Sequence, residues 1–112
     1  MIFTPWNVGA PVQHKKTSVT YILTGTRGDG SIQISVPAPE WVSGDGFEES
    51  VLPITPSFRL GDQVIYEPMG FIGIVNGWRI LPDGAEQVFT SHPHIKAGDS
   101  GWCPATGFRR YP

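Results

Sequence analysis

Apolar and polar residues alternate most clearly between residues 18 and 36, in the stretch "SVTYILTGTRGDGSIQISV". The apolar positions of its first half are Val19, Tyr21 and Leu23, and those of its second half are Ile32, Ile34 and Val36. A period of two with β-branched and aromatic residues is typical of strands, and "TRGDG" between the halves supplies the glycines of a tight reversal. The pattern predicts a β-hairpin over residues 18–36 with one apolar face.

A second set of strands is predicted between residues 50 and 92. "QVIYEP" and "FIGIVNGWRI" read as consecutive strands, and "LPDG" reads as a turn into the return strand "AEQVFTSH". Gly73 and Gly77 within the long strand indicate bends or bulges, which curl a small sheet towards closure. The segment is therefore expected to be a barrel-like meander, with Trp78 in its core.

The two ends of the chain carry no such alternation. Residues 1–17 and 95–112 are rich in glycine and proline and are expected to form irregular arms, of the kind that find burial on a neighbouring chain. With 112 residues, 14 glycines and 11 prolines, the chain is expected to be a single β domain, residues 1–112. The predicted fold is all-β: an N-terminal hairpin packed on a small, strongly bent barrel.

The stretch "LGDQVIYEPMGFIGIVNGWRILPDG" resembles the start of small Src-homology-3-like (SH3-like) barrels. In that family the first strand often opens with Gly-Asp-x-Val, and the next strand carries Gly-x-Val/Ile before a turn. The resemblance covers residues 60–89 and implies a small, tightly turning barrel. It implies no activity, because such barrels serve many functions.

The charge and the cysteine content of the chain limit its possible binding partners and cross-links. A formal net charge of −2 with eight basic residues leaves no basic footprint for nucleic acid or anionic lipid. The single cysteine excludes an internal disulfide. The start of the chain lacks the pattern of a signal peptide, and "FIGIVNGW" is far shorter than the roughly 20 residues that span a bilayer. A protein without a membrane segment is expected, located in the cytoplasm or assembled in a particle.

Candidate chemistry gathers in "SHPHIKAGDSGWCP", residues 91–104. On an extended strand His92 and His94 point the same way, and Cys103 and His14 would complete a four-ligand set suited to zinc. The spacing matches no established metal motif, so the alternative is two exposed histidines around a proline, with no cofactor.

The same histidines carry a second resemblance. "SHPHIKAG" is similar to the Ser-His-x-His segment of contractile-tail phage spike proteins, in which a trimer holds one iron among six histidines. That resemblance implies iron bound by His92 and His94 of three copies, although the repetitive β-helix of the family is missing upstream.

Gly-Asp-Ser-Gly within the same stretch resembles the nucleophile loop of chymotrypsin-like serine proteases. The resemblance implies Ser100 as the nucleophile, His14 as the base, and Asp29, Asp45 or Asp62 as the orienting acid. Too few residues follow Ser100 for the strands of a substrate pocket, and the same four residues also form an ordinary turn.

The tryptophans give the last indication. Trp6, Trp41 and Trp102 lie in Gly/Pro-rich segments, where exposure and a role in an interface or ligand surface are expected. The preferred interpretation is a non-enzymatic binding or assembly module, bound to itself as a homo-oligomer or to another protein, as a structural component of a virion or mobile element. The alternative is a small enzyme acting at residues 91–104, as a degenerate serine protease or through a metal.

Overall fold

The described part of the chain folds into short antiparallel strands joined by turns, with no helix of seven or more residues. The computed structural model describes residues 3–50, 54–91 and 101–111. The strands are β1 (Pro11–His14), β2 (Thr20–Thr26), β3 (Ser31–Ile34), β4 (Val42–Ser43), β5 (Phe47–Glu49), β6 (Gln63–Tyr66), β7 (Phe71–Ile80), β8 (Glu86–Thr90), β9 (Trp102–Pro104) and β10 (Phe108–Arg110). Three 3₁₀ turns accompany them, η1 (Pro5–Asn7), η2 (Gly44–Gly46) and η3 (Ala105–Gly107). The all-β prediction is confirmed, and the described ranges contain no helix that is long and apolar enough to cross a membrane.

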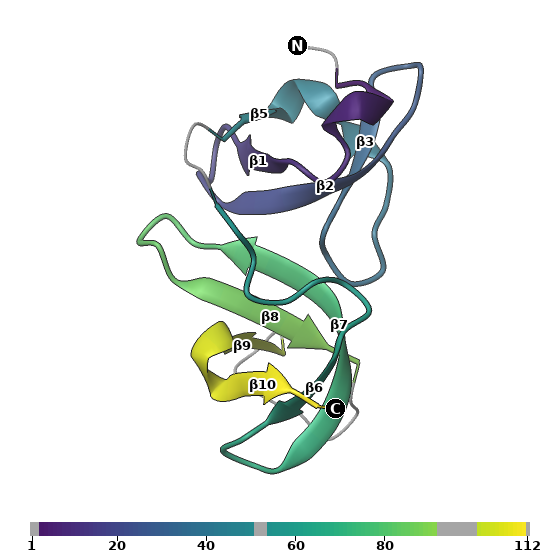
Figure 1. The fold of residues 1–112 in the computed structure, drawn as a ribbon. Helices are drawn as coiled ribbons and strands as arrows, with labels where there is room; N and C mark the ends of the chain where they lie inside the picture. The colour runs from purple at the N-terminus through teal and green to yellow at the C-terminus, as the bar shows by residue number, and fades with distance from the viewer. Residues whose placement is uncertain (1–2, 51–53, 92–100, 112) are drawn as a thin grey trace.

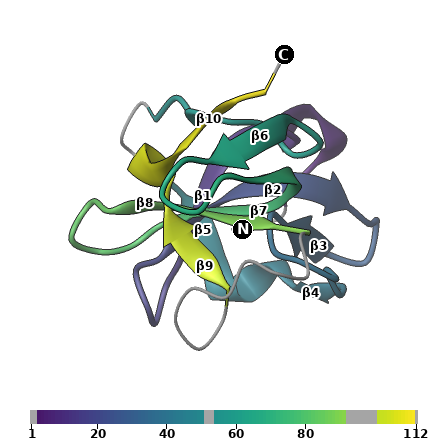
Figure 2. The ribbon, with the colours of Figure 1, turned by 90° about the horizontal axis from the view of Figure 1, so that it is seen from below.

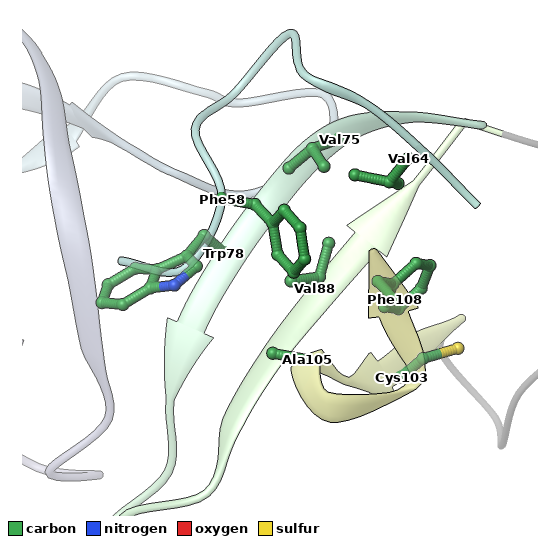
Figure 3. Close-up of a cluster of buried hydrophobic side chains, with 8 residues drawn as sticks. All are labelled: Phe58, Val64, Val75, Trp78, Val88, Cys103, Ala105 and Phe108. Carbon is green, nitrogen blue, oxygen red and sulfur yellow. The ribbon is translucent and has the colours of Figure 1, made fainter. Parts of the chain in front are cut away.

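The strands gather into two lobes with separate cores. The first lobe, residues 3–50, holds β1 to β5, and the second lobe, residues 54–91 and 101–111, holds β6 to β10 (Figure 1). The core of the first lobe consists of Phe3, Val12, Leu23, Ile32, Ile34 and Phe47. The core of the second lobe, drawn in Figure 3, consists of Phe58, Val64, Val75, Trp78, Val88, Cys103, Ala105 and Phe108. Trp78 is buried as predicted.

The two lobes repeat one strand order. In the first lobe β1 pairs with β2 and β5, β2 pairs with β3, and β3 pairs with β4. In the second lobe β6 pairs with β7 and β10, β7 pairs with β8, and β8 pairs with β9. Each set contributes five strands to one curled antiparallel sheet of ten strands, and Figure 2 views the molecule from below. This curled arrangement is compatible with a small SH3-like barrel.

The repetition extends to the turn of the central hairpin in each lobe. The Asp29 carboxylate accepts the amide N–H of Ser31 at 2.9 Å, and the Asp83 carboxylate accepts that of Ala85 at 2.9 Å. The glycine after each aspartate has a φ near +90°, a conformation that glycine adopts without strain. Both aspartates therefore serve the backbone of a turn, as their position beside glycine predicts.

A bulge also recurs at the same place in both lobes. The pairing of β2 with β3 shifts register between Leu23 and Gly25, and that of β7 with β8 shifts between Val75 and Gly77. The bend predicted at Gly77 is confirmed, and its counterpart at Gly25 adds a second feature that the two lobes share besides their strand order.

The ends of the chain differ from the expectation. Residues 1–17 include β1, and residues 95–112 include β9 and β10, so the prediction of irregular arms is wrong for these strands. The strands are only three or four residues long, and Pro11 and Pro104 lie at strand ends, where the missing N–H is tolerated. Such short segments show no alternation in sequence, although each buries one side chain.

The lobes are joined through one buried serine. The Ser35 hydroxyl accepts the amide of Ile22 at 2.9 Å and donates to the carbonyl oxygen of Trp78 at 2.7 Å. The amide of Trp78 donates to the carbonyl oxygen of Ser35 at 2.9 Å, and Thr20 pairs with Ile80 at the only β2–β7 register position. Since Ser35 is fully buried, this network fixes the second lobe against the first.

We expect Ser35→Ala to lower the free energy of unfolding by about 1–3 kcal/mol, because the Ile22 amide and the Trp78 carbonyl lose a buried partner. Chemical denaturation followed by tryptophan fluorescence measures the change. Ser50→Ala, at a partly exposed position after β5, is the matched control and should stay within about 0.5 kcal/mol of wild type. Equal stabilities of the two variants would contradict the role of Ser35.

Candidate functional site

A cleft of about 650 Å³ lies between the two lobes. Its apolar lining includes Val8 and Ile22 from the first lobe and Leu60 and Trp78 from the second. Ligand-binding pockets are mostly apolar and measure roughly 300–1,000 Å³. This inter-lobe cleft therefore has the size and lining of a binding site for a small group or a peptide side chain.

One carboxylate anchors the segment that precedes β6 beside this cleft. Glu86 accepts hydrogen bonds from the Ser57 amide at 2.8 Å, the Ser57 hydroxyl at 2.6 Å and the Trp78 indole N–H at 2.6 Å. The segment carries Phe58 and Leu60 on the cleft wall, and Trp78 also lines the cleft. The wall is therefore held in place before any ligand arrives, which reduces the entropy cost of binding.

Two large apolar side chains of the cleft remain open to solvent. Val8 is 47% exposed and Leu60 is 43% exposed. They occupy equivalent positions, since each precedes a glycine whose amide donates across the lobe, Gly9 to Leu23 and Gly61 to Val75. Single exposed apolar residues are common, but a pair that lines one concave surface indicates a contact site.

The charge of the cleft is positive. Arg59 and Arg110 both line it, and none of the described carboxylates does. Asp62, nearby, accepts the Arg59 amide at 2.9 Å and lies 3.8 Å from the Arg110 guanidinium, so it balances one of the two charges. An apolar group that carries a carboxylate would match this lining.

His14 is engaged within the first lobe. Its Nδ1 accepts the amides of Lys16 at 3.1 Å and Thr17 at 3.3 Å, and its ring meets the ring of Phe47 edge-on, with 4.9 Å between centroids. The side chain thus caps the turn after β1 and packs on the core. This role is structural and uses the ring nitrogen that faces the turn.

Cys103 lies in the other lobe. It is fully buried in β9, within the second core, and burial raises the pKa of its thiol above the ordinary range. His14 and Cys103, which the zinc hypothesis brings together, thus pack in different lobes. In the described ranges no three or more His, Cys, Asp or Glu side chains are grouped as metal ligands would be.

The remaining residues of the metal and protease hypotheses are His92, His94 and Ser100. All three lie outside the described residues, so both hypotheses stay predictions. Of the three aspartates considered for a triad, Asp29 and Asp62 bind backbone amides in turns. The Ser31 amide, as the main cause, lowers the pKa of the Asp29 carboxyl.

Trp41 and Trp102 occupy equivalent positions in the two lobes. The guanidinium carbon of Arg27 lies 4.0 Å from the ring centroid of Trp41, and that of Arg79 lies 4.2 Å from that of Trp102. A cation over an aromatic face contributes about 0.5–1 kcal/mol at exposed sites. One face of each indole is therefore covered within its own lobe, and the Cη2 edge of each packs over a glycine, Gly25 under Trp41 and Gly77 under Trp102.

Trp6 contrasts with these two rings. It lies on η1 at the surface of the first lobe and is 94% exposed, the highest exposure among the large hydrophobic residues described. Of the three tryptophans that the sequence assigns to an interface, Trp6 has the exposure that such a role requires.

No local sequence pattern indicates the inter-lobe cleft. Its wall residues Arg59 and Leu60 read as an ordinary turn before β6, and Ile22 reads as a strand position. Only the relative placement of the lobes brings these residues together, and no local pattern encodes that placement.

The duplicated glycines give a comparative prediction. A methyl group added at Gly77 would lie 2.9 Å from both Trp102 Cη2 and Phe89 Cβ, whereas one at Gly25 would meet Trp41 Cη2 at 3.3 Å. We expect Gly77→Ala to destabilise the protein by roughly 1–3 kcal/mol and Gly25→Ala by less, because an overpacked core must shift.

Thermal or chemical denaturation of these variants provides the measurement, with Gly28→Ala as the control. The added methyl at Gly28 meets nothing within 4 Å, so its effect should be small. If Gly25→Ala proves the more damaging of the two core variants, the packing argument is wrong.

The Cys103 thiol gives a pH prediction. The folded state raises the pKa of the Cys103 thiol and so favours its neutral form. The contribution of the neutral thiol to the free energy of unfolding is therefore full below the ordinary thiol pKa of about 8.5, and it is lost as the pH rises above that value. The free energy of unfolding should therefore decline more steeply in wild type than in Cys103→Ala between about pH 8 and 10. Parallel pH profiles would contradict this origin of the decline.

No protein-family model matches the chain, and searches of curated proteins and of solved structures return no significant match. The residues and their geometry are thus the basis on which a function can be assigned.

Proposed function

We propose that the protein is a non-enzymatic binding module whose inter-lobe cleft takes an extended segment of a partner protein. The segment would insert an apolar side chain between the lobes and present a carboxylate to Arg59 and Arg110. The observation that carries this proposal is the cleft itself, with apolar residues from both lobes and two arginines in one lining.

Three features support a peptide as the ligand. The Val8 and Leu60 side chains leave exposed apolar area that a partner would cover. The Glu86 hydrogen bonds hold Trp78 and the segment before β6 in place, which favours binding without rearrangement. The arginines supply planar donors that suit a carboxylate in two-point contact.

We also propose that each lobe is an SH3-like barrel, which extends the sequence resemblance at residues 60–89 to the whole chain. The shared strand order, the bulge and the 3₁₀ turn before the last strand of each lobe support this assignment. A setting in a virion or mobile element remains a prediction of the sequence. The enzyme alternative rests on Ser100, His92 and His94, and nothing in the described ranges favours it.

Selection from a library of displayed random peptides tests the cleft. We expect enriched peptides to combine a large apolar residue with Asp, Glu or a free C-terminal carboxylate. Leu60→Asp should weaken their binding at least tenfold, about 1.4 kcal/mol, because it sets a carboxylate against the ligand and removes apolar contact.

Ile74→Asp is the matched control, since Ile74 is 41% exposed, almost as much as Leu60, and does not line the cleft. Arg59→Glu should reduce binding of the same peptides, with a larger loss at low salt. The proposal fails if the selected peptides bind Leu60→Asp as tightly as they bind Ile74→Asp, or if they carry no carboxylate.

A further inference from the structure

The two ends of the main strand path through the sheet are equivalent strands of the two lobes, while β4 and β9 end its two branches. The strand path runs from β10 through β6, β7, β2 and β1 to β5. Within the described residues β5 pairs only with β1 and β10 pairs only with β6. Each therefore presents an edge, and β5 and β10 belong to opposite lobes (Figure 1).

These two edges carry opposite charges. The acidic edge, β5, places Glu48 and Glu49 in solvent, and the basic edge, β10, places Arg109 and Arg110 there. Both strands begin with a buried phenylalanine that anchors them to their cores. The same position in the duplicated fold thus bears two negative charges in one lobe and two positive charges in the other.

The charged side chains are only weakly engaged within the molecule. The Arg109 guanidinium lies 3.3 Å from the Glu67 carboxylate, with both side chains more than half exposed. The Asn7 amide group donates to Glu49 at 3.4 Å. Exposed contacts of this kind contribute about 0–1 kcal/mol, so they leave the edges available to another charged surface.

We propose that copies of this protein associate head to tail, with β5 of one copy pairing antiparallel to β10 of the next. A register with Glu48 opposite Arg109 fits the backbone, because the N–H and C=O groups of both residues point away from the free edges, towards β1 and β6. The same register sets Glu49 diagonally beside Arg110 on the other face, so each face gains one pair of opposite charges.

The charge pattern also selects this geometry against others. Two acidic edges repel each other, as do two basic edges, so symmetric pairing of like edges is disfavoured. Only unlike edges attract, and a heterologous contact of this type repeats from copy to copy. It closes into a ring or continues as a filament, depending on the rotation between copies.

An exposed aromatic residue accompanies each charged edge. Trp6 is 94% exposed and lies next to Asn7, whose side chain contacts Glu49 on the acidic edge. Tyr111 is 40% exposed and follows Arg110 directly on the basic edge. Trp, Tyr and Arg are the residue types that contribute most often to interface affinity, so both surfaces have the composition of an interface.

This association does not depend on the peptide-binding role of the cleft. The acidic edge shares no residue with the cleft lining, and Arg110 is the one residue of the basic edge that the two sites share. The acidic-edge variant below should therefore keep its affinity for cleft-binding peptides, so the two proposals can fail separately.

Charge reversal tests the contact by sedimentation velocity on the full chain. At low ionic strength, about 0.01 M, wild type should form concentration-dependent oligomers that dissociate in about 1 M salt, where the Debye length falls to roughly 3 Å. The double variants Glu48→Arg with Glu49→Arg, and Arg109→Glu with Arg110→Glu, should each self-associate at least tenfold more weakly than wild type.

Recombination of the reversed edges provides the decisive comparison. An equimolar mixture of the two double variants should recover association, and so should the chain that carries all four reversals. The neutral variant Glu48→Gln with Glu49→Gln, which alters shape least, should weaken association even if a reversed chain folds poorly. A monomeric wild type under all conditions, oligomers unchanged by reversal, or failure of both recombined forms would each overturn the proposal.

Discussion

The hydrogen bonds of Ser35 are the constraint on which the arrangement of this molecule depends. A buried hydroxyl that accepts from one lobe and donates to the other opposes sliding of the lobes, because a shift would leave an amide and a carbonyl without a partner and away from water. The walls of the inter-lobe cleft come from both lobes, so their spacing follows from this network. A wider or narrower cleft would require different partners for the same backbone groups.

The two lobes share their strand order, although few of their residues are identical. Positions with a steric or conformational demand are the same in both: the glycine beneath each tryptophan, the arginine over it, and the Asp-Gly of each hairpin turn. Positions with no such demand have diverged. The charged pairs of β5 and β10 are the clearest example, since both lie in solvent, which tolerates either sign.

Local pattern predicted the parts of this fold that local physics determines. The hairpin at 18–36, the β7–β8 pair, the buried Trp78 and the bend at Gly77 all follow from alternation and turn chemistry within a few residues. The three-residue strands β9 and β10 were missed because a single buried side chain produces no period. The similarity of the two lobes is not visible in the sequence. The second hairpin is longer than the first, and the connections between equivalent strands differ in length, so equivalent residues are not separated by a constant interval.

The candidate site was harder to predict for a related reason. Trp6 could be assigned to the surface from its glycine- and proline-rich surroundings, and its exposure agrees with that assignment. A histidine such as His14 is a residue type suited to a metal ligand or a general base. In the structure its ring nitrogen instead accepts hydrogen bonds from two amides of its own turn, and sequence alone does not distinguish this role from catalysis. The cleft and the charged edges depend on which lobes and strands become neighbours in the fold. This cannot be read from any short segment of the sequence.

The order of the two edge strands along the chain has a consequence for biosynthesis. The acidic edge is complete once Glu49 has emerged from the ribosome, whereas the basic edge follows only after Phe108, an interval of several seconds at about 5–20 residues per second. Nascent chains on one messenger RNA would thus first expose their acidic edges, which repel one another. The complementary basic edge would be made late, so that growing chains would not join one another.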